Sequence, residues 1–250
     1  MVWPSDRCLI IRCVHNLAIT TLKKVLIILI NTIIIIVITI KREGVNLKFS
    51  LYGISEELLD KLSFESKLGK SLKNTLRKFE KDDLFNEIID LKEFYESTDL
   101  LKGVNFAYRV KSIQSCLLKY YKYYLHIEVN KCFNDILGIR VITNNYNEVL
   151  EQDLSIFKVA NMINGKANDD GYRGLHLYYQ KTNKHYPIEI QINTKHDRIM
   201  NDWLHVHLYK YEKNSIIGEL LRKKYNSEEI KSEFDFMEVL KNVLSSSEEI

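Results

Sequence analysis

Proline is almost absent from this sequence, with 2 prolines among 250 residues. Because proline interrupts helices and central strands, its scarcity allows long regular elements to continue unbroken. Tyrosine is common at 15 residues, and charged residues make up 28% of the chain. This composition is typical of a folded protein and argues against intrinsic disorder. The length leaves room for one substantial domain and an additional segment.

Metal and redox motifs built on cysteine are also missing. The four cysteines include no Cys-x-x-Cys pair and no close zinc-ligand spacing with histidine. We therefore expect buried thiols in a reducing compartment, which places the folded region in the cytoplasm. A strong excess of one charge sign is lacking too. The net charge of +3 permits binding of nucleotides or RNA without requiring it.

The first 44 residues differ from the rest of the chain. Residues 25–40 carry no charge, and with the preceding residues the segment 17–40 is long enough to cross a bilayer, although two lysines lie within it. No small-residue cleavage site follows, so a cleaved signal peptide is not expected. Two interpretations stay open. The segment is an apolar helix that anchors the protein in a membrane, or the start site is assigned too early and the protein begins near Val45 or Leu47.

A helical region is expected over residues 45–103. Ser55 can cap a first helix, because acidic residues fill the turn that follows it. Apolar residues at helical spacing predict a second helix over 64–80, and a third covers 83–97. Lysines and arginines cover the remainder of the second helix. They form either a solvated face, which we favour, or a basic strip that meets a polyanion.

A strand over 104–110 followed by a helix over 113–124 is the first candidate site. Ser112 is a suitable N-cap for this helix, and a helix start with basic neighbours can bind phosphate oxygens. The residues that point to phosphate binding here are Arg109, Lys111, Ser115 and Lys119.

Acidic and amide side chains accompany two further predicted strands. Asp135 opens a strand over 135–142, where it is either a turn residue or a magnesium ligand. Residues 171–194 predict a hairpin whose second arm alternates isoleucines with Glu189, Gln191 and Asn193. That polar row can be a solvated face of an antiparallel sheet, but beside Asp135 and the basic residues it can also carry chemistry.

The remaining elements complete the predicted order. A strand is expected over 156–163, then a helix over 194–211 whose buried side contains Trp203, Leu204 and Leu208, and helices over 216–225 and 228–244. We divide the chain into an N-terminal apolar segment (1–44), a helical region (45–103), a central domain (104–212) and C-terminal helices (213–250).

Four motifs in this order resemble one family. Residues 108–119 match the pattern Arg-x-Lys-x-x-x-Ser-x-x-x-Lys, and residues 135–141 read Asp-Ile-Leu-Gly-Ile-Arg-Val. Residues 171–176 read Gly-Tyr-Arg-Gly-Leu-His, and residues 188–192 read Ile-Glu-Ile-Gln-Ile. Each motif is weak alone, but together they resemble the RelA/SpoT nucleotide pyrophosphokinase domain, and most closely the single-domain small alarmone synthetases.

The resemblance implies an α/β fold of the α+β type, a nucleotidyltransferase-like mixed sheet flanked by helices. It also implies an enzyme of the stringent response, which transfers the β,γ-pyrophosphate of ATP to the ribose 3′-hydroxyl of GDP or GTP. Relatives often form homo-oligomers, and we expect one here. Some compact relatives are toxins that pyrophosphorylate the 3′ end of tRNA, so tRNA is an alternative acceptor. A membrane-anchored nucleotide-binding protein with weak catalysis is a third hypothesis.

Residue roles follow from the same resemblance. Asp135 and Glu189 match the residues that hold Mg²⁺, and Glu189 also matches the group that draws the proton from the attacking hydroxyl. The residues that match the ATP side are Arg109, Lys111, Ser115, Lys119 and Arg140. The residues that match the acceptor side are Tyr172, His176 and Gln191, with the tyrosine stacked on guanine.

Two departures from the family pattern concern the acceptor side. Asn193 stands where many members carry a basic residue, and the loop before Gly171 carries Asn168-Asp169-Asp170 in place of Pro-Lys.

Overall fold

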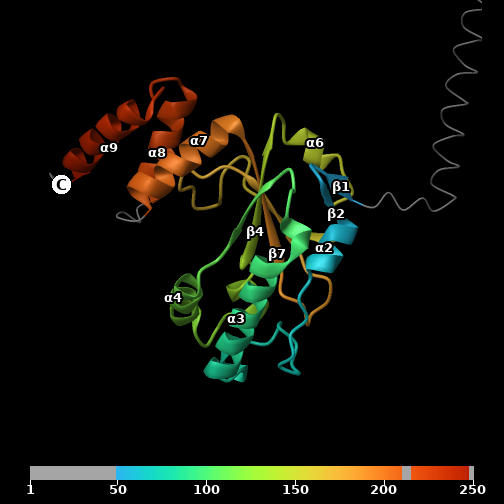
Figure 1. Cartoon of the computed structure of the whole chain (residues 1–250). Helices are drawn as coiled ribbons and strands as arrows, with labels where there is room; N and C mark the ends of the chain where they lie inside the picture. Colours follow the sequence, from blue (N-terminus) through green and yellow to red (C-terminus); the bar gives the residue numbers. More distant parts are fainter. Residues whose placement is uncertain (1–48, 210–214, 248–250) are drawn as a thin grey trace, which may run out of the picture. The chain divides into compact units, whose positions relative to one another are not determined.

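The computed structural model describes residues 49–209 and 215–247, and Figure 1 shows their arrangement. The elements are β1 (Ser50–Leu51), β2 (Ile54–Ser55), α2 (Glu56–Leu62), η1 (Leu76–Lys78), α3 (Lys81–Ser97), η2 (Asp99–Leu101), β3 (Ala107–Val110), α4 (Ile113–Tyr123), α5 (Val129–Cys132), β4 (Leu137–Thr143), α6 (Asn147–Leu150), β5 (Phe157–Asn161), β6 (Leu175–Tyr179), β7 (Ile188–Thr194), α7 (Lys195–Trp203), η3 (Leu204–Leu208), α8 (Ser215–Asn226) and α9 (Glu233–Ser247).

A mixed sheet of five strands lies at the centre, in the order β3-β4-β7-β6-β5. Strands β4 and β7 are parallel, and the other neighbouring pairs are antiparallel. The predicted hairpin is confirmed, because β6 pairs with β7 from Leu175 opposite Ile192 to Tyr179 opposite Ile188. The predicted mixed sheet flanked by helices is confirmed as well.

Strand β7 is buried on both faces. Its isoleucines at 188, 190 and 192 are buried, and so are Glu189 and Asn193 on the opposite face. The polar row is therefore not a solvated face, which was one of the two interpretations of this strand. Buried carboxylate and amide groups are stable only when they have hydrogen-bond or ion-pair partners, so the contacts of Glu189 and Asn193 indicate the role of this row.

A large apolar cluster, here called the sheet core, fills the space between the sheet and the helices before it. It includes Ile139, Leu177 and Ile190 from the sheet, and Leu84 and Leu91 from α3. The residues before β3 thus share one core with the strands that carry the motifs.

The predicted helix over 64–80 is wrong. Only the short 3₁₀ turn η1 is helical there, although Leu72, Leu76 and Phe79 are buried as the spacing suggested. The backbone bonds to other segments instead: the amide of Leu72 donates to the carbonyl of Asn183, at 2.8 Å, and the amide of Leu76 to the carbonyl of Ile127, at 3.0 Å. These tertiary partners replace the bonds that a helix would make within itself.

Helices α7, α8 and α9 gather in a second region, which ends at the red C-terminus in Figure 1. Their apolar faces meet in a smaller cluster, here called the C-terminal cluster, with Met200, Leu204, Leu221, Phe236 and Leu240 among its buried members. As predicted, Leu204 and Leu208 lie on the buried side and Trp203 packs against them. The end of the predicted helix over 194–211 differs, because α7 continues as the π-helix η3.

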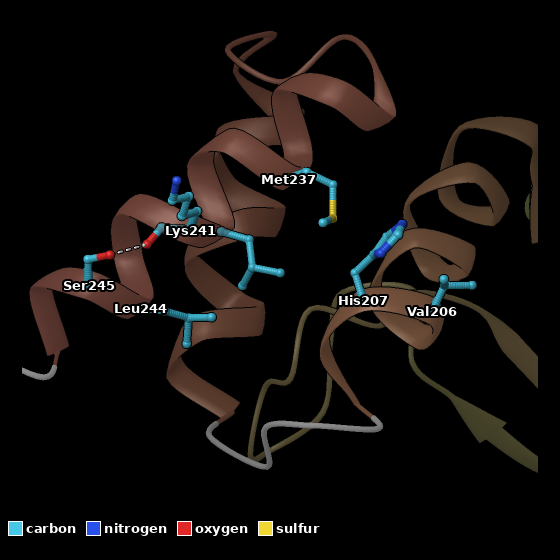
Figure 2. Close-up of a pocket in the computed structure, with 7 residues that line it drawn as sticks. Val206, His207, Met237, Lys241, Leu244 and Ser245 are labelled. Carbon is cyan, nitrogen blue, oxygen red and sulfur yellow. Dashed lines mark hydrogen bonds between the residues drawn. The ribbon is translucent and has the colours of Figure 1, made fainter.

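A cavity of about 540 Å³ lies between η3 and α9. Figure 2 shows Met237 of α9 facing His207 of η3 across it. None of the motif residues lines this cavity.

The predicted N-terminal apolar helix falls outside the described residues, and so does the predicted membrane segment 17–40. Among residues 49–209 and 215–247, no helix combines the length and the apolar character needed to cross a bilayer. The division of the chain at residues 45, 104 and 213 stays a prediction.

Candidate active site

Two rows of polar residues cross one face of the sheet, because the strand registers align them. Partners in register point to the same face of a sheet, so side chains far apart in sequence become neighbours. The first row contains Arg109, Gly138, Glu189 and Tyr178, and the second contains Arg140, Gln191 and His176. Gly138 leaves the space beside Glu189 open, since a Cβ atom there would lie 3.6 Å from Glu189 Oε2.

Asp135 lies just before β4, with its carboxylate between two lysines. Lys111 Nζ is 2.6 Å from Oδ2, and Lys119 Nζ is 3.0 Å from Oδ1. Burial raises the pKa of Asp135, but the two lysines outweigh this effect and the pKa is lowered. The group is therefore ionised at neutral pH, and the lysines compensate its charge.

Glu189 is 5% exposed, and both of its oxygens are occupied. Tyr178 donates to Oε1 at 3.1 Å, and Gln191 donates to Oε2 at 2.8 Å. His176 Nδ1 lies 3.2 Å from Oε1. Burial raises the pKa of Glu189, but His176 and Gln191 reverse the shift, so the pKa is lowered and the carboxylate stays ionised.

Two cavities adjoin on this face and share His176. The first, here called the carboxylate pocket, has a volume of about 450 Å³ and is lined by Lys119, Tyr123, Ile127, Lys131, Asn134, Asp135, Met162, His176, Tyr178 and Glu189. The second, here called the arginine pocket, has a volume of about 360 Å³ and is lined by Arg109, Arg140, Tyr172, His176, Gln191, Arg198, Asn201, Asp202, His205 and Tyr209.

Three arginines converge on the arginine pocket. Burial lowers the pKa of Arg140, and the neighbouring charges of Arg198 and Arg109 lower it further. Arg198 is paired with Asp202 through Nε at 2.8 Å and Nη2 at 2.6 Å. Planar guanidinium groups stack on flat rings and bind phosphates, so this pocket suits a nucleotide.

Tyr172 is one of the residues that line the arginine pocket. Its hydroxyl lies 2.7 Å from His176 Nε2, which connects it to Glu189 through the imidazole. Lys166 Nζ lies over the ring, 5.2 Å from its centroid. Burial is the main cause that raises the pKa of this tyrosine, so it is neutral at physiological pH.

Residues 168–174, here called the tyrosine loop, are shaped by the departures from the family pattern. Asp169 forms a two-point ion pair with Arg173, with both distances 2.7 Å, and also accepts from the amide of Gly171 at 2.9 Å. Asn193 donates to the carbonyl of Arg173 at 2.8 Å. These residues hold the loop itself, which is a structural reason for amide and carboxylate groups at those positions.

The predicted site residues come together, with one exception. Lys119, Asp135 and Glu189 line one pocket and Arg109, Arg140, Tyr172 and Gln191 the other, while His176 lines both. Lys111 reaches the site through Asp135. Ser115 lines neither pocket and its hydroxyl instead lies 2.9 Å from that of Ser112. The residues of the arginine pocket that the sequence analysis missed are Arg198, Asn201, Asp202, His205 and Tyr209, all from α7, η3 and the turn after them.

The carboxylate pocket fits a magnesium ion. Asp135 and Glu189 are hard oxygen donors, and Mg²⁺ is commonly bound through one or two carboxylates together with substrate phosphates and waters. Within the described ranges, no group of three or more His, Cys, Asp or Glu side chains could hold a metal ion. Phosphate oxygens and waters would therefore have to complete the coordination.

Comparison with known families agrees with this arrangement. Residues 108–214 match the model described as "Region found in RelA / SpoT proteins". Residues 108–214 are a RelA/SpoT domain. The predicted RelA/SpoT family is confirmed for these residues, which supports the coarse class of activity, that of a pyrophosphotransferase. No curated protein matches the chain.

Several solved structures are similar to the chain. Small alarmone synthetase 1 from Bacillus subtilis bound to its product pppGpp is 20% identical, with 68% of this chain and 91% of that chain covered and a TM-score of 0.38. Small alarmone synthetase 2 from the same organism is 23% identical, with 67% and 95% covered and a TM-score of 0.36. A GTP pyrophosphokinase family protein from Streptococcus pneumoniae is 20% identical, with 67% and 88% covered and a TM-score of 0.34.

Proposed function

We propose that the RelA/SpoT domain transfers the β,γ-pyrophosphate of ATP to the ribose 3′-hydroxyl of GDP or GTP, in the presence of Mg²⁺. One observation carries this proposal. Two ionised carboxylates, Asp135 and Glu189, lie in one pocket, and a pocket that suits nucleotides adjoins it at His176. The arginine pocket carries residues of both the ATP side, Arg109 and Arg140, and the acceptor side, Tyr172, so two nucleotides that enter it can meet beside the carboxylates.

The chain's own residues supply positioning and charge. Arg109 and Arg140 would hold the adenine and phosphates of ATP, and Lys111 and Lys119 would turn from Asp135 to the phosphate oxygens. Tyr172 would stack on the guanine of the acceptor. Positioning and charge neutralisation are the main requirements of this class of transfer.

The reaction balances with these groups. The acceptor 3′-oxygen forms a bond to the β-phosphorus of ATP, the bond from that phosphorus to the α-phosphate oxygen breaks, and AMP leaves. Glu189 accepts the hydroxyl proton. Mg²⁺ bound at Asp135 and Glu189 would neutralise the charge that develops on the phosphate oxygens. Arginine and lysine side chains offset the remaining charge.

Labelled substrate tests the proposal. The full chain is incubated with Mg²⁺, ATP labelled at the γ-phosphate, and GDP, GTP or tRNA in separate reactions. We expect label on GDP or GTP, AMP rather than ADP as the second product, and no transfer by Glu189→Gln. A matched variant on an exposed position of α9, Glu238→Gln, should keep full activity.

Two results would replace this proposal. Label found only on tRNA would make the chain a tRNA-modifying enzyme, the alternative acceptor. ATP and GDP binding without transfer to any acceptor would favour a nucleotide-binding protein with weak catalysis.

A further inference from the structure

One face of α8 touches the tyrosine loop, although α8 begins after the matched region ends at residue 214. Ser215, Gly218 and Arg222 recur at spacings of three and four residues, which places them on the same face of a helix. At the start of this face, the Ser215 hydroxyl donates to Asn168 Oδ1 at 2.9 Å. The contact is therefore made along the helix and not at a single point.

Gly218 and Gly171 bring the backbones of α8 and the loop together. A Cβ atom at Gly218 would lie 2.0 Å from the carbonyl oxygen of Asp170, and one at Gly171 would lie 2.3 Å from the carbonyl oxygen of Gly218. Both neighbours are backbone atoms, so they cannot swing aside as a flexible side chain can. Glycine inside a helix lowers helix stability, and close approach of another segment is a common reason for it.

Arg222, the charged residue among these three, is almost completely buried, with 1% of its surface exposed. Its Nε donates to the carbonyl of Gly171 at 2.7 Å, Nη1 to Asp197 at 3.0 Å and Nη2 to Asn201 Oδ1 at 2.8 Å. A buried ion pair is often less stabilising than apolar packing of the same volume, so stability alone is a weak reason for an arginine here. Its planar donors instead fix three groups relative to one another.

Asn201 extends this network to the other side of Tyr172. Its Oδ1, which accepts from Arg222, also accepts from the amide of Arg173 at 3.1 Å, and its Nδ2 donates to the carbonyl of Arg173 at 2.6 Å. The backbone is thus held at residue 171 by Arg222 and at residue 173 by Asn201. Tyr172 lies between these two points.

We propose that α8 positions Tyr172 for the acceptor nucleotide, with Gly218 and Arg222 as positioning residues that hold the tyrosine loop against the helix. The inference rests on the proposed function, because it assigns the acceptor base to Tyr172. It extends the acceptor site beyond the RelA/SpoT domain into the C-terminal helices. The ATP side, which is carried by β3 and β4, makes none of these contacts with α8.

Three variants test the inference in the full chain. Gly218→Ala pushes the loop away through its new Cβ, whereas Arg222→Gln removes the charge and one donor direction. Arg222→Lys keeps the charge toward Asp197 but cannot donate to three groups in one plane. Lys223→Gln is the matched control, because Lys223 is largely exposed and paired with Glu219 within α8.

The readouts separate positioning from general stability. Each variant is assayed at least about 15 °C below its own Tm, and its KM for acceptor and for ATP are measured separately. We expect KM for the acceptor to rise about tenfold or more in Gly218→Ala and Arg222→Gln, with KM for ATP changed by less than about twofold. Arg222→Lys should show an intermediate rise, and Lys223→Gln should match the wild type.

Hydrogen exchange gives a readout besides activity. We expect faster exchange in a peptide that covers residues 168–174 of Gly218→Ala and Arg222→Gln, and unchanged exchange in a peptide that covers β4. An unchanged KM for the acceptor in both folded variants would overturn the inference, and so would equal rises in both KM values.

Failure of the proposed function would look different. A wild-type protein that makes no product with GDP, GTP or tRNA contradicts that function. Calorimetric binding of GDP to the same variants then tests α8 alone: weaker binding than in the wild type supports the inference, and unchanged binding overturns it.

Discussion

The sheet core and the C-terminal cluster differ in how they hold the functional side chains of the candidate site. The sheet core lies directly beneath the strands, so Glu189 and Arg140 alternate with buried residues of the same strands. The C-terminal cluster reaches Tyr172 through Arg222 and Asn201, which bond to the loop on both sides of it. Glu189 is thus fixed by strand register and Asp135, just before β4, by its two lysines, whereas the tyrosine is fixed by polar contacts from separate helices.

This difference has a functional meaning. Strand register cannot shift by one residue without exposing the apolar row, so the part of the carboxylate pocket formed by His176, Tyr178 and Glu189 is held in place. Loop contacts can be altered one at a time without refolding the sheet. We therefore expect variants of the sheet to affect both substrates and variants of the C-terminal helices to affect mainly the acceptor.

The largest expected effect is on catalysis by the two carboxylates. Asp135→Asn or Glu189→Gln should remove several kcal/mol of transition-state stabilisation, which is on the order of 1000-fold in rate. A neutral amide binds Mg²⁺ poorly, while the fold should persist because the shape of each side chain is kept. Transfer rates with ATP and GDP provide the measurement. Near-normal turnover in either variant would show that the metal site lies elsewhere.

The free energy of unfolding should fall when a buried side chain of either cluster is shortened to alanine. Ile190→Ala in the sheet core and Leu221→Ala in the C-terminal cluster each remove a side chain that is 0% exposed. Each should lower the free energy of unfolding by about 2–5 kcal/mol, measured by urea denaturation. Leu220→Ala is the control, because that neighbour is 37% exposed. A loss as small as that of the control would mean that the cluster is not a cooperative part of the fold.

Tyr172 tests the acceptor side alone. Tyr172→Ala should lower acceptor affinity roughly tenfold or more, because stacking of a base on an aromatic ring contributes about 1–3 kcal/mol. Tyr172→Phe should keep most of the affinity, since the ring survives and only the polar contacts of the hydroxyl, with His176 and Asn193, are lost. ATP affinity should barely change in either variant. A sharp drop in Tm together with parallel losses of both substrates would identify an ordinary core tyrosine.

The smallest effects concern the ATP side. Arg109→Ala and Arg140→Ala should each weaken ATP binding by about 1 kcal/mol, or about fivefold, because a guanidinium group that stacks on a ring contributes about that much. The exposed Arg77 provides the control variant Arg77→Ala. KM for ATP should rise with every acceptor tested. Unchanged ATP binding in both pocket variants would remove the arginines from the donor site.

The sequence predicted the elements and residues that short, continuous patterns of the chain determine. Alternation in residues 188–194 predicted the hairpin, and the family resemblance implied the mixed sheet. The motifs predicted four of the ten residues that line the carboxylate pocket and five of the ten that line the arginine pocket. The predicted helix over 64–80 is wrong because these residues bury their apolar side chains in a mostly irregular segment. Backbone amides of this segment donate to carbonyls that are distant in the sequence. Tertiary hydrogen bonds of this kind leave no mark on hydrophobic periodicity.

The sequence analysis also missed the residues that the C-terminal helices add to the candidate site. Arg198 and Arg222 lie on helices, where charged residues usually face solvent, so nothing in the local pattern marks them as buried or as part of a pocket. Gly218 was the one available signal, because a glycine inside a helix often marks close approach of another segment. Its partner could not be identified without the fold.

Binding of the two substrates to the two cluster variants tests the central claim most directly. Calorimetry measures Kd for a non-hydrolysable ATP analogue and for GDP in wild type, Ile190→Ala and Leu221→Ala, under conditions where all three are folded. We predict that Leu221→Ala weakens GDP binding by at least about fivefold and changes binding of the ATP analogue by less than about twofold, while Ile190→Ala weakens both. Equal losses of both ligands in Leu221→Ala, or no loss of either, would contradict the separate roles of the two regions.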